Sequence, residues 1–126
     1  MKEDTLQKAQ QEGRAPWSKI LFELKECVWF EDGYPVTPGH SLIVPKVVNQ
    51  KNLMKCFDLA LKVANENIQK GTCDGYNIGI NMGTAAGQTC MYPHVHLIPR
   101  RKGDCENPKG GVRHVIPGKG DYTANG

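Results

Sequence analysis

Two histidines, His94 and His96, stand one residue apart in the segment Tyr92–Arg100. Side chains alternate between the two faces of a strand, so both imidazoles would project to one side. The apolar residues Val95 and Leu97 would then anchor the other side in a core. Near neutral pH an imidazole can be a nucleophile, a general acid or a metal ligand. By itself the pair is compatible with catalysis, with a metal site, or with ordinary structural histidines.

A loop of small residues, 83–89, precedes this strand and has the chemistry to bind an anion. Gly87 lets the backbone approach a ligand closely and expose its amide N–H groups, and Gln88 and Thr89 add a side-chain amide and a hydroxyl. The arginine pair at 100–101 places positive charge directly after the histidines. Electrostatic stabilisation is a large term in phosphoryl transfer. The combination predicts a site that holds phosphate oxygens while a histidine attacks phosphorus.

The hydrophobic pattern indicates the elements that must position these residues. Short apolar runs bounded by turn residues predict strands at 20–24, 26–31, 41–44, 76–81 and 92–99. Apolar residues at helical spacing from Leu53 to Ile68 predict one amphipathic helix that ends at Gly71. Strands flanking a single long helix predict an α+β fold with an antiparallel β-sheet.

The ends of the chain differ in character from its centre. We predict a single domain over residues 1–126, with a core at about 17–101. Residues 2–12 predict a polar helix or frayed arm at the surface, with only Leu6 and Ala9 suited to burial. Residues 102–126 predict an irregular tail that drapes over the surface or over a partner subunit.

Composition limits the class of protein. Hydrophobic residues make up 39% of the 126 residues and charged residues 23%, as in ordinary globular proteins. The net charge of +3 is much smaller than expected for a protein with a basic stripe that binds nucleic acid. An odd number of cysteines, five, without a C-x-x-C pair speaks against a disulfide framework and a structural zinc site. With no apolar run long enough for a bilayer and no signal-like start, we expect a cytoplasmic protein without a membrane or nucleic-acid polymer as partner.

Two long motifs resemble the histidine triad (HIT) superfamily of nucleotide hydrolases and transferases. The family signature, His-φ-His-φ-His-φ-φ, is commonly preceded by Gly-Gln-Thr and followed by Pro-Arg, and residues 87–100 read GQTCMYPHVHLIPR. Residues 32–46 are similar to the family segment Asp-x-x-Pro-x-x-Pro-Gly-His, and Asn81 matches a third position. The resemblance covers roughly residues 20–101.

The resemblance implies catalytic roles by position. His94 corresponds to the nucleophile, which would attack the α-phosphorus and give a nucleotidyl-histidine that water hydrolyses. His96 would contact phosphate or the leaving group, and Gln88 would help to orient the nucleophile. The expected substrates are dinucleoside polyphosphates or nucleoside phosphoramidates, no cofactor is expected, and family members are usually homodimers.

The resemblance also implies a set of nucleotide-binding residues. Asp32 matches the position that holds the ribose hydroxyls, and Asn81 contacts the nucleotide. The phosphate would lie against Gly87, Gln88 and Thr89, and the purine against Phe30 and Ile43. His40, which follows Pro-Gly at a strand start, is predicted to be structural, and Trp17 to belong to the core or an interface.

One position departs from the signature, because Tyr92 stands where the first histidine is expected. A tyrosine hydroxyl can donate and accept hydrogen bonds, but it is not an acid at neutral pH. The change bears on rate and substrate range more than on nucleotide binding. Two alternatives therefore stay open: a nucleotide-binding module with little catalysis, and a metal-binding protein that uses His94, His96 and either Cys90 or Cys105.

Overall fold

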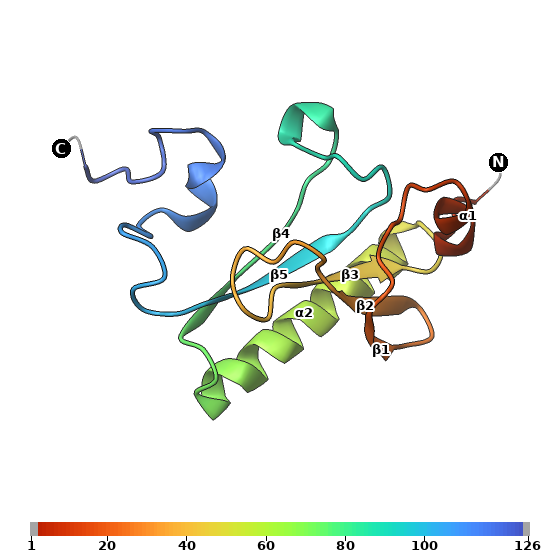
Figure 1. Ribbon diagram of the computed structural model, residues 1–126, viewed down its shortest axis with the longest axis horizontal. Helices are drawn as coiled ribbons and strands as arrows, with labels where there is room; N and C mark the ends of the chain where they lie inside the picture. Colours follow the sequence, from red (N-terminus) through yellow and green to blue (C-terminus); the bar gives the residue numbers. More distant parts are fainter. Residues whose placement is uncertain (1–2, 125–126) are drawn as a thin grey trace.

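The computed structural model describes residues 3–124 and has one five-stranded antiparallel sheet (Figure 1). The strand order is β1-β2-β3-β5-β4. The elements are α1 (Leu6–Gln11), β1 (Ile20–Glu23), β2 (Cys27–Glu31), β3 (Ser41–Pro45), α2 (Gln50–Lys70), β4 (Gly75–Ile80), η1 (Thr84–Ala86), β5 (Val95–Arg100) and η2 (Gly111–Val115). The predicted α+β class is confirmed. Within residues 3–124, no helix combines the length and hydropathy needed to cross a bilayer.

The long helix α2 covers one face of the sheet. It begins after Asn49, whose side chain accepts a hydrogen bond from the backbone N–H of Asn52 at 2.8 Å. It ends at Gly71, which adopts the left-handed conformation with φ 77°. Its apolar side packs on alternate strand residues to form one core cluster: Cys27, Ile43, Cys56, Ala60, Val63, Val95 and Leu97. The helix predicted from Leu53 to Ile68 is therefore confirmed and is one turn longer at its N-terminus.

The N-terminal segment packs on the opposite face. Leu6 and Ala9 of α1 are buried in a second core cluster, together with Ala15, Val28, Phe30, Leu42, Val44 and Tyr92. The guanidinium of Arg14 donates to both carboxylate oxygens of Asp4 and to the carbonyl of Met91. The helix is therefore shorter than the predicted range 2–12, and Leu6 and Ala9, the two residues predicted to suit burial, are buried. Lys2 lies outside the described residues.

The strand β5 begins at Val95, and not at Tyr92 as predicted. Its ladder starts where Val95 pairs with Ile43 on one side and Ile80 on the other. Pro93 has no backbone N–H to contribute to a ladder, which explains the later start. Residues 92–94 therefore precede the strand without belonging to the sheet. Within β5, His96 lies between Leu42 of β3 and Gly79 of β4.

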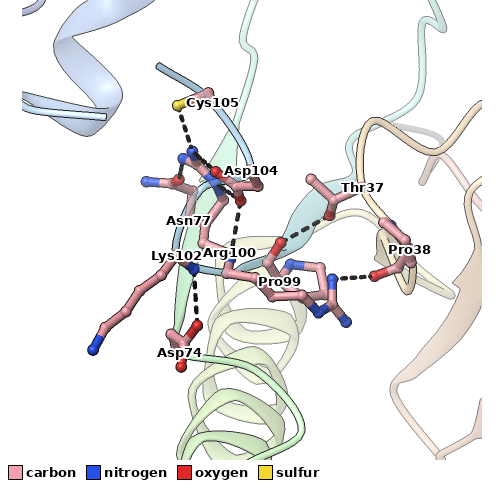
Figure 2. Close-up of polar contacts among 10 residues, drawn as sticks. Thr37, Pro38, Asp74, Asn77, Pro99, Arg100, Lys102, Asp104 and Cys105 are labelled. Atoms are coloured by element: carbon pink, nitrogen blue, oxygen red, sulfur yellow. Dashed lines mark hydrogen bonds and ion pairs between the residues drawn. The ribbon is translucent and has the colours of Figure 1, made fainter. Parts of the chain in front are cut away.

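The tail after β5 contains a single 3₁₀ turn, η2, among its described residues. Its start is pinned by hydrogen bonds from Thr37 Oγ1 to the carbonyl of Pro99 and from the backbone N–H of Lys102 to Asp74 (Figure 2). Apart from this turn, residues 101–124 contain no helix or strand.

Candidate functional site

His94 lies immediately before β5, is only 6% exposed, and lines a cleft of about 620 Å³. Its Nδ1 atom lies 2.7 Å from the carbonyl oxygen of Tyr92. Because a carbonyl can only accept, Nδ1 carries the proton and donates. The neutral ring then holds its free lone pair on Nε2. The main-chain contact thus selects the tautomer of the neutral ring in which Nε2 can act as a nucleophile.

His96 is held by a chain of hydrogen bonds that begins at the backbone. The N–H of Val36 donates to Nδ1 of His40 at 3.1 Å, so His40 carries its own proton on Nε2. That Nε2 lies 3.0 Å from Nδ1 of His96 and 3.3 Å from Oδ2 of Asp32. His96 Nδ1 accepts the His40 proton, so neutral His96 keeps its own proton on Nε2.

The charge state of these rings follows from burial. Burial lowers the pKa of His96 to about 4, with repulsion from His94 and then His40 acting in the same direction and Asp32 opposing. Burial also lowers the pKa of His40, against the attraction of Asp32. Both rings are therefore neutral at physiological pH, as the hydrogen-bond chain requires.

The two neighbouring imidazoles are chemically complementary. The ring centroids of His94 and His96 lie 5.0 Å apart. One ring offers a lone pair on Nε2 and the other offers an N–H on Nε2. The pair can attack an electrophilic centre and donate a hydrogen bond to an oxygen bound to it.

Most of the predicted binding residues come together around this pair. The cleft is lined by residues from several separate segments of the chain, among them Asp32, Asn81, Gly87 and Thr89. Gln88 is placed differently from the prediction, because it braces the loop. Its Oε1 accepts from the N–H of Gly83 at 2.9 Å, and its Nε2 donates to the carbonyl of Cys90 at 3.1 Å.

The two residues predicted to line the purine pocket do not reach the cleft. Ile43 is fully buried on the face of the sheet that packs on α2. Phe30 is buried on the correct face but lies behind Trp17, with ring centroids 6.4 Å apart. Leu42 and Trp17 line the cleft in their place. Their positions correct the prediction for Phe30 and Ile43.

Trp17 and His40 belong to the site in addition to the structural roles predicted for them. Trp17 packs against the N-terminal core cluster, and His40 accepts a hydrogen bond from Val36 in the turn. The indole of Trp17 lies 4.8 Å from the His94 ring, centroid to centroid, on the wall of the cleft. Nothing in the pattern around Trp17 pointed to this. For His40 the signal was present, because it ends the Asp-x-x-Pro-x-x-Pro-Gly-His segment that begins at Asp32.

Tyr92 takes no part in this network through its side chain. The ring is fully buried in the N-terminal core cluster, and its hydroxyl donates to the carbonyl of Pro45 at 2.5 Å. Burial raises the pKa of this hydroxyl well above its usual range. Only the backbone carbonyl of Tyr92 contacts His94.

A metal ion fits these residues poorly. Within residues 3–124, Asp32, His40 and His96 are the sole group of three candidate ligands close together, and their atoms lie 3.0, 3.3 and 4.0 Å apart. Tetrahedral zinc places ligand atoms about 3.3 Å apart, so the spacing alone would suit it. The proton on His40 Nε2 occupies the lone pair that a metal would need. The alternative set, with His94 and Cys90 or Cys105, is not assembled.

Comparison with known proteins identifies the family of the chain. The family model described as HIT domain matches residues 14–103. An adenylylsulfatase of Arabidopsis thaliana is 33% identical over 100 residues, which cover 74% of this chain and 50% of that protein. A bis(5'-adenosyl)-triphosphatase of Dictyostelium discoideum is 36% identical over 103 residues, or 73% of this chain and 69% of that protein. The chain therefore spans about half the length of the first of these relatives.

A solved structure has the same fold. A zinc-bound histidine triad family protein from Mycobacterium smegmatis superposes with a TM-score of 0.65 at 30% sequence identity. The match covers 80% of this chain and 78% of that one.

Proposed function

This chain belongs to the HIT domain family, and on that premise we propose that it hydrolyses or transfers nucleotides through a covalent intermediate on His94. Relatives at 33% and 36% identity are named for splitting adenylyl sulfate and diadenosine triphosphate, respectively. Both names describe hydrolysis of a bond to a nucleotide phosphate. The specific substrate and the roles below are our proposal for this chain.

The observation that carries the proposal is the pair of opposite tautomers in one cleft. His94 Nε2 would attack the α-phosphorus, forming a P–N bond while the bond to the leaving-group oxygen breaks. The Nε2–H of His96 would donate a hydrogen bond to that oxygen as its negative charge develops. Water would then attack the phosphorus, break the P–N bond and release the mononucleotide and a proton.

The rest of the cleft would bind the nucleotide. Asp32 can accept hydrogen bonds from ribose hydroxyls, while Asn81, Thr89 and the backbone at Gly87 can hold phosphate oxygens. Gln88 would act indirectly by bracing this loop. We propose a purine mononucleotide unit of a dinucleoside polyphosphate as the bound group.

The assignment of His94 is tested by substitution. His94→Asn and His94→Ala should each lower kcat by at least about a thousandfold on diadenosine triphosphate and adenylyl sulfate. Wild-type protein quenched during turnover should carry a nucleotidyl adduct by intact mass spectrometry, and the variants should carry none. Turnover that survives both substitutions would remove the nucleophile from the mechanism.

We also propose that the chain forms a homodimer. Met54, Leu61 and Ile68 are exposed apolar residues seven positions apart on α2, so they form one stripe along the helix. The strand β4 lies at the edge of the sheet, and one row of its backbone groups has no strand neighbour among residues 3–124. A second copy could cover both. The expectations of no cofactor and of a cytoplasmic location stay predictions.

A further inference from the structure

A second cavity, of about 690 Å³, adjoins the first cleft. It lies between the β4–β5 part of the sheet and the C-terminal tail. His96 and Asn81 line both spaces, so the two meet at these residues. A ligand whose phosphorus lies near His94 has room to continue past His96 into the second cavity.

Gly79 keeps this cavity open beside His96. It pairs directly with His96 across the sheet and lines the cavity. Its φ is not positive, so the backbone conformation does not require glycine. A Cβ placed there would meet nothing within 4 Å, so packing does not require glycine either. Glycine inside a strand is unfavourable and often marks a place where a ligand approaches closely.

The walls of the cavity suit an uncharged group better than a phosphate. Its one arginine, Arg100, already donates to both carboxylate oxygens of Asp104 at 2.8 Å and to Asn77 Oδ1 at 2.6 Å (Figure 2). Arg100 holds the pKa of Asp104 far below its usual range, so this ion pair persists at physiological pH. The positive charge is therefore already balanced.

The remaining walls are largely apolar. Val36, Ile98, Val112 and Val115 contribute to the lining, and the cavity volume is within the range of about 300–1,000 Å³ typical of small-molecule sites. A flat heterocycle with a sugar, which has apolar faces and polar edges, matches these walls.

We propose that the second cavity binds the nucleoside on the leaving-group side of a dinucleoside polyphosphate. The first cleft then binds the nucleoside attached to the attacked phosphorus, and the phosphate chain passes His96. This inference rests on the proposed function and makes it more specific. The protein should favour substrates with a nucleoside at each end over those with a small leaving group such as sulfate.

The test compares two ligands that differ only in the second nucleoside. One is diadenosine triphosphate with methylene groups in place of the bridging oxygens, and the other is the matching analogue of adenosine triphosphate. By calorimetry, wild-type protein should bind the first at least about tenfold more tightly. Gly79→Leu, which fills the cavity, should reduce this preference to less than about twofold.

Gly75→Leu is the matched control. Gly75 lies on the same strand and the same face, a Cβ there also meets nothing within 4 Å, and it lines neither cavity. This variant should keep the wild-type preference. Gly79→Ala replaces the leucine variant if thermal unfolding shows that the latter does not fold, with a smaller loss of preference expected.

The outcomes separate the two proposals. Equal binding of both analogues to wild type, or an undiminished preference in every folded Gly79 variant, would overturn the second site. Equal loss in Gly79→Leu and Gly75→Leu would also overturn it. A preference that disappears only in the Gly79 variants, in a protein that turns over no nucleotide, would support the site and refute the hydrolase. If the protein is active, the Gly79 variants should also show a lower ratio of kcat/KM for diadenosine triphosphate to kcat/KM for adenylyl sulfate. This ratio should fall together with their binding preference.

Discussion

Replacing Tyr92 with phenylalanine removes one hydroxyl group and leaves the ring in place. That hydroxyl donates to the carbonyl of Pro45, and both residues are fully buried. A buried acceptor that loses its donor costs about 1–3 kcal/mol, so the free energy of unfolding should fall by about that amount. Urea unfolding followed by tryptophan fluorescence measures the change.

Catalysis should respond differently from stability. His94 is oriented by the carbonyl of Tyr92, which remains in every variant at this position. We therefore expect kcat of Tyr92→Phe to stay within about twofold of wild type. Tyr92→His restores the histidine of the family signature, but it should lower stability without raising kcat, because a smaller polar ring enters an apolar core.

A clear result would refute this reasoning. If folded Tyr92→Phe loses more than about tenfold in kcat, the hydroxyl belongs to the catalytic network after all. A marked gain in kcat for Tyr92→His would contradict the separation of the side chain from the site. It would support the alternative of a binding module weakened by tyrosine.

Two further predictions concern pH and assembly. The pKa of His96 is lowered to about 4 by burial and then by His94 and His40, against 6.5 in the unfolded chain, so the unfolded state binds more protons between these values. The free energy of unfolding should fall by about 1.4 kcal/mol per pH unit as pH decreases through this window, and His96→Asn should remove that share of the slope in chemical unfolding. If the free energy of unfolding of wild type and of His96→Asn depends on pH with the same slope, the lowered pKa does not belong to His96. In sedimentation analysis, Leu61→Glu should yield monomers while the neighbouring exposed control Lys62→Glu stays dimeric, and a dimer that persists in both would exclude α2 as the interface.

Local patterns predicted the parts of the molecule that local physics determines. The end of α2 at Gly71 follows from helical periodicity and a left-handed cap, both of which are visible in the sequence. The shared face of His94 and His96 follows from alternation along an extended segment. These features depend on neighbours a few residues apart.

The features that local patterns missed are contacts between distant residues. His40 reaches His96 across 56 positions, and Tyr92 reaches Pro45 across 47, so neither partner was visible in the local pattern. Ile43 was misplaced for another reason. All five residues of its strand are buried, so hydrophobicity gave no indication of which face was the core under α2 and which was the cleft.

The contact of Arg14 with Met91 has a consequence for where this protein can be shortened. The family match begins at residue 14, so a boundary drawn there would look natural. It would remove Asp4, which holds the guanidinium in place, and the two α1 side chains that pack with Tyr92. The shortened chain would keep every residue that lines the cleft beside His94. It would lose the contacts that support the segment orienting His94, so residues 3–13 help to position the site.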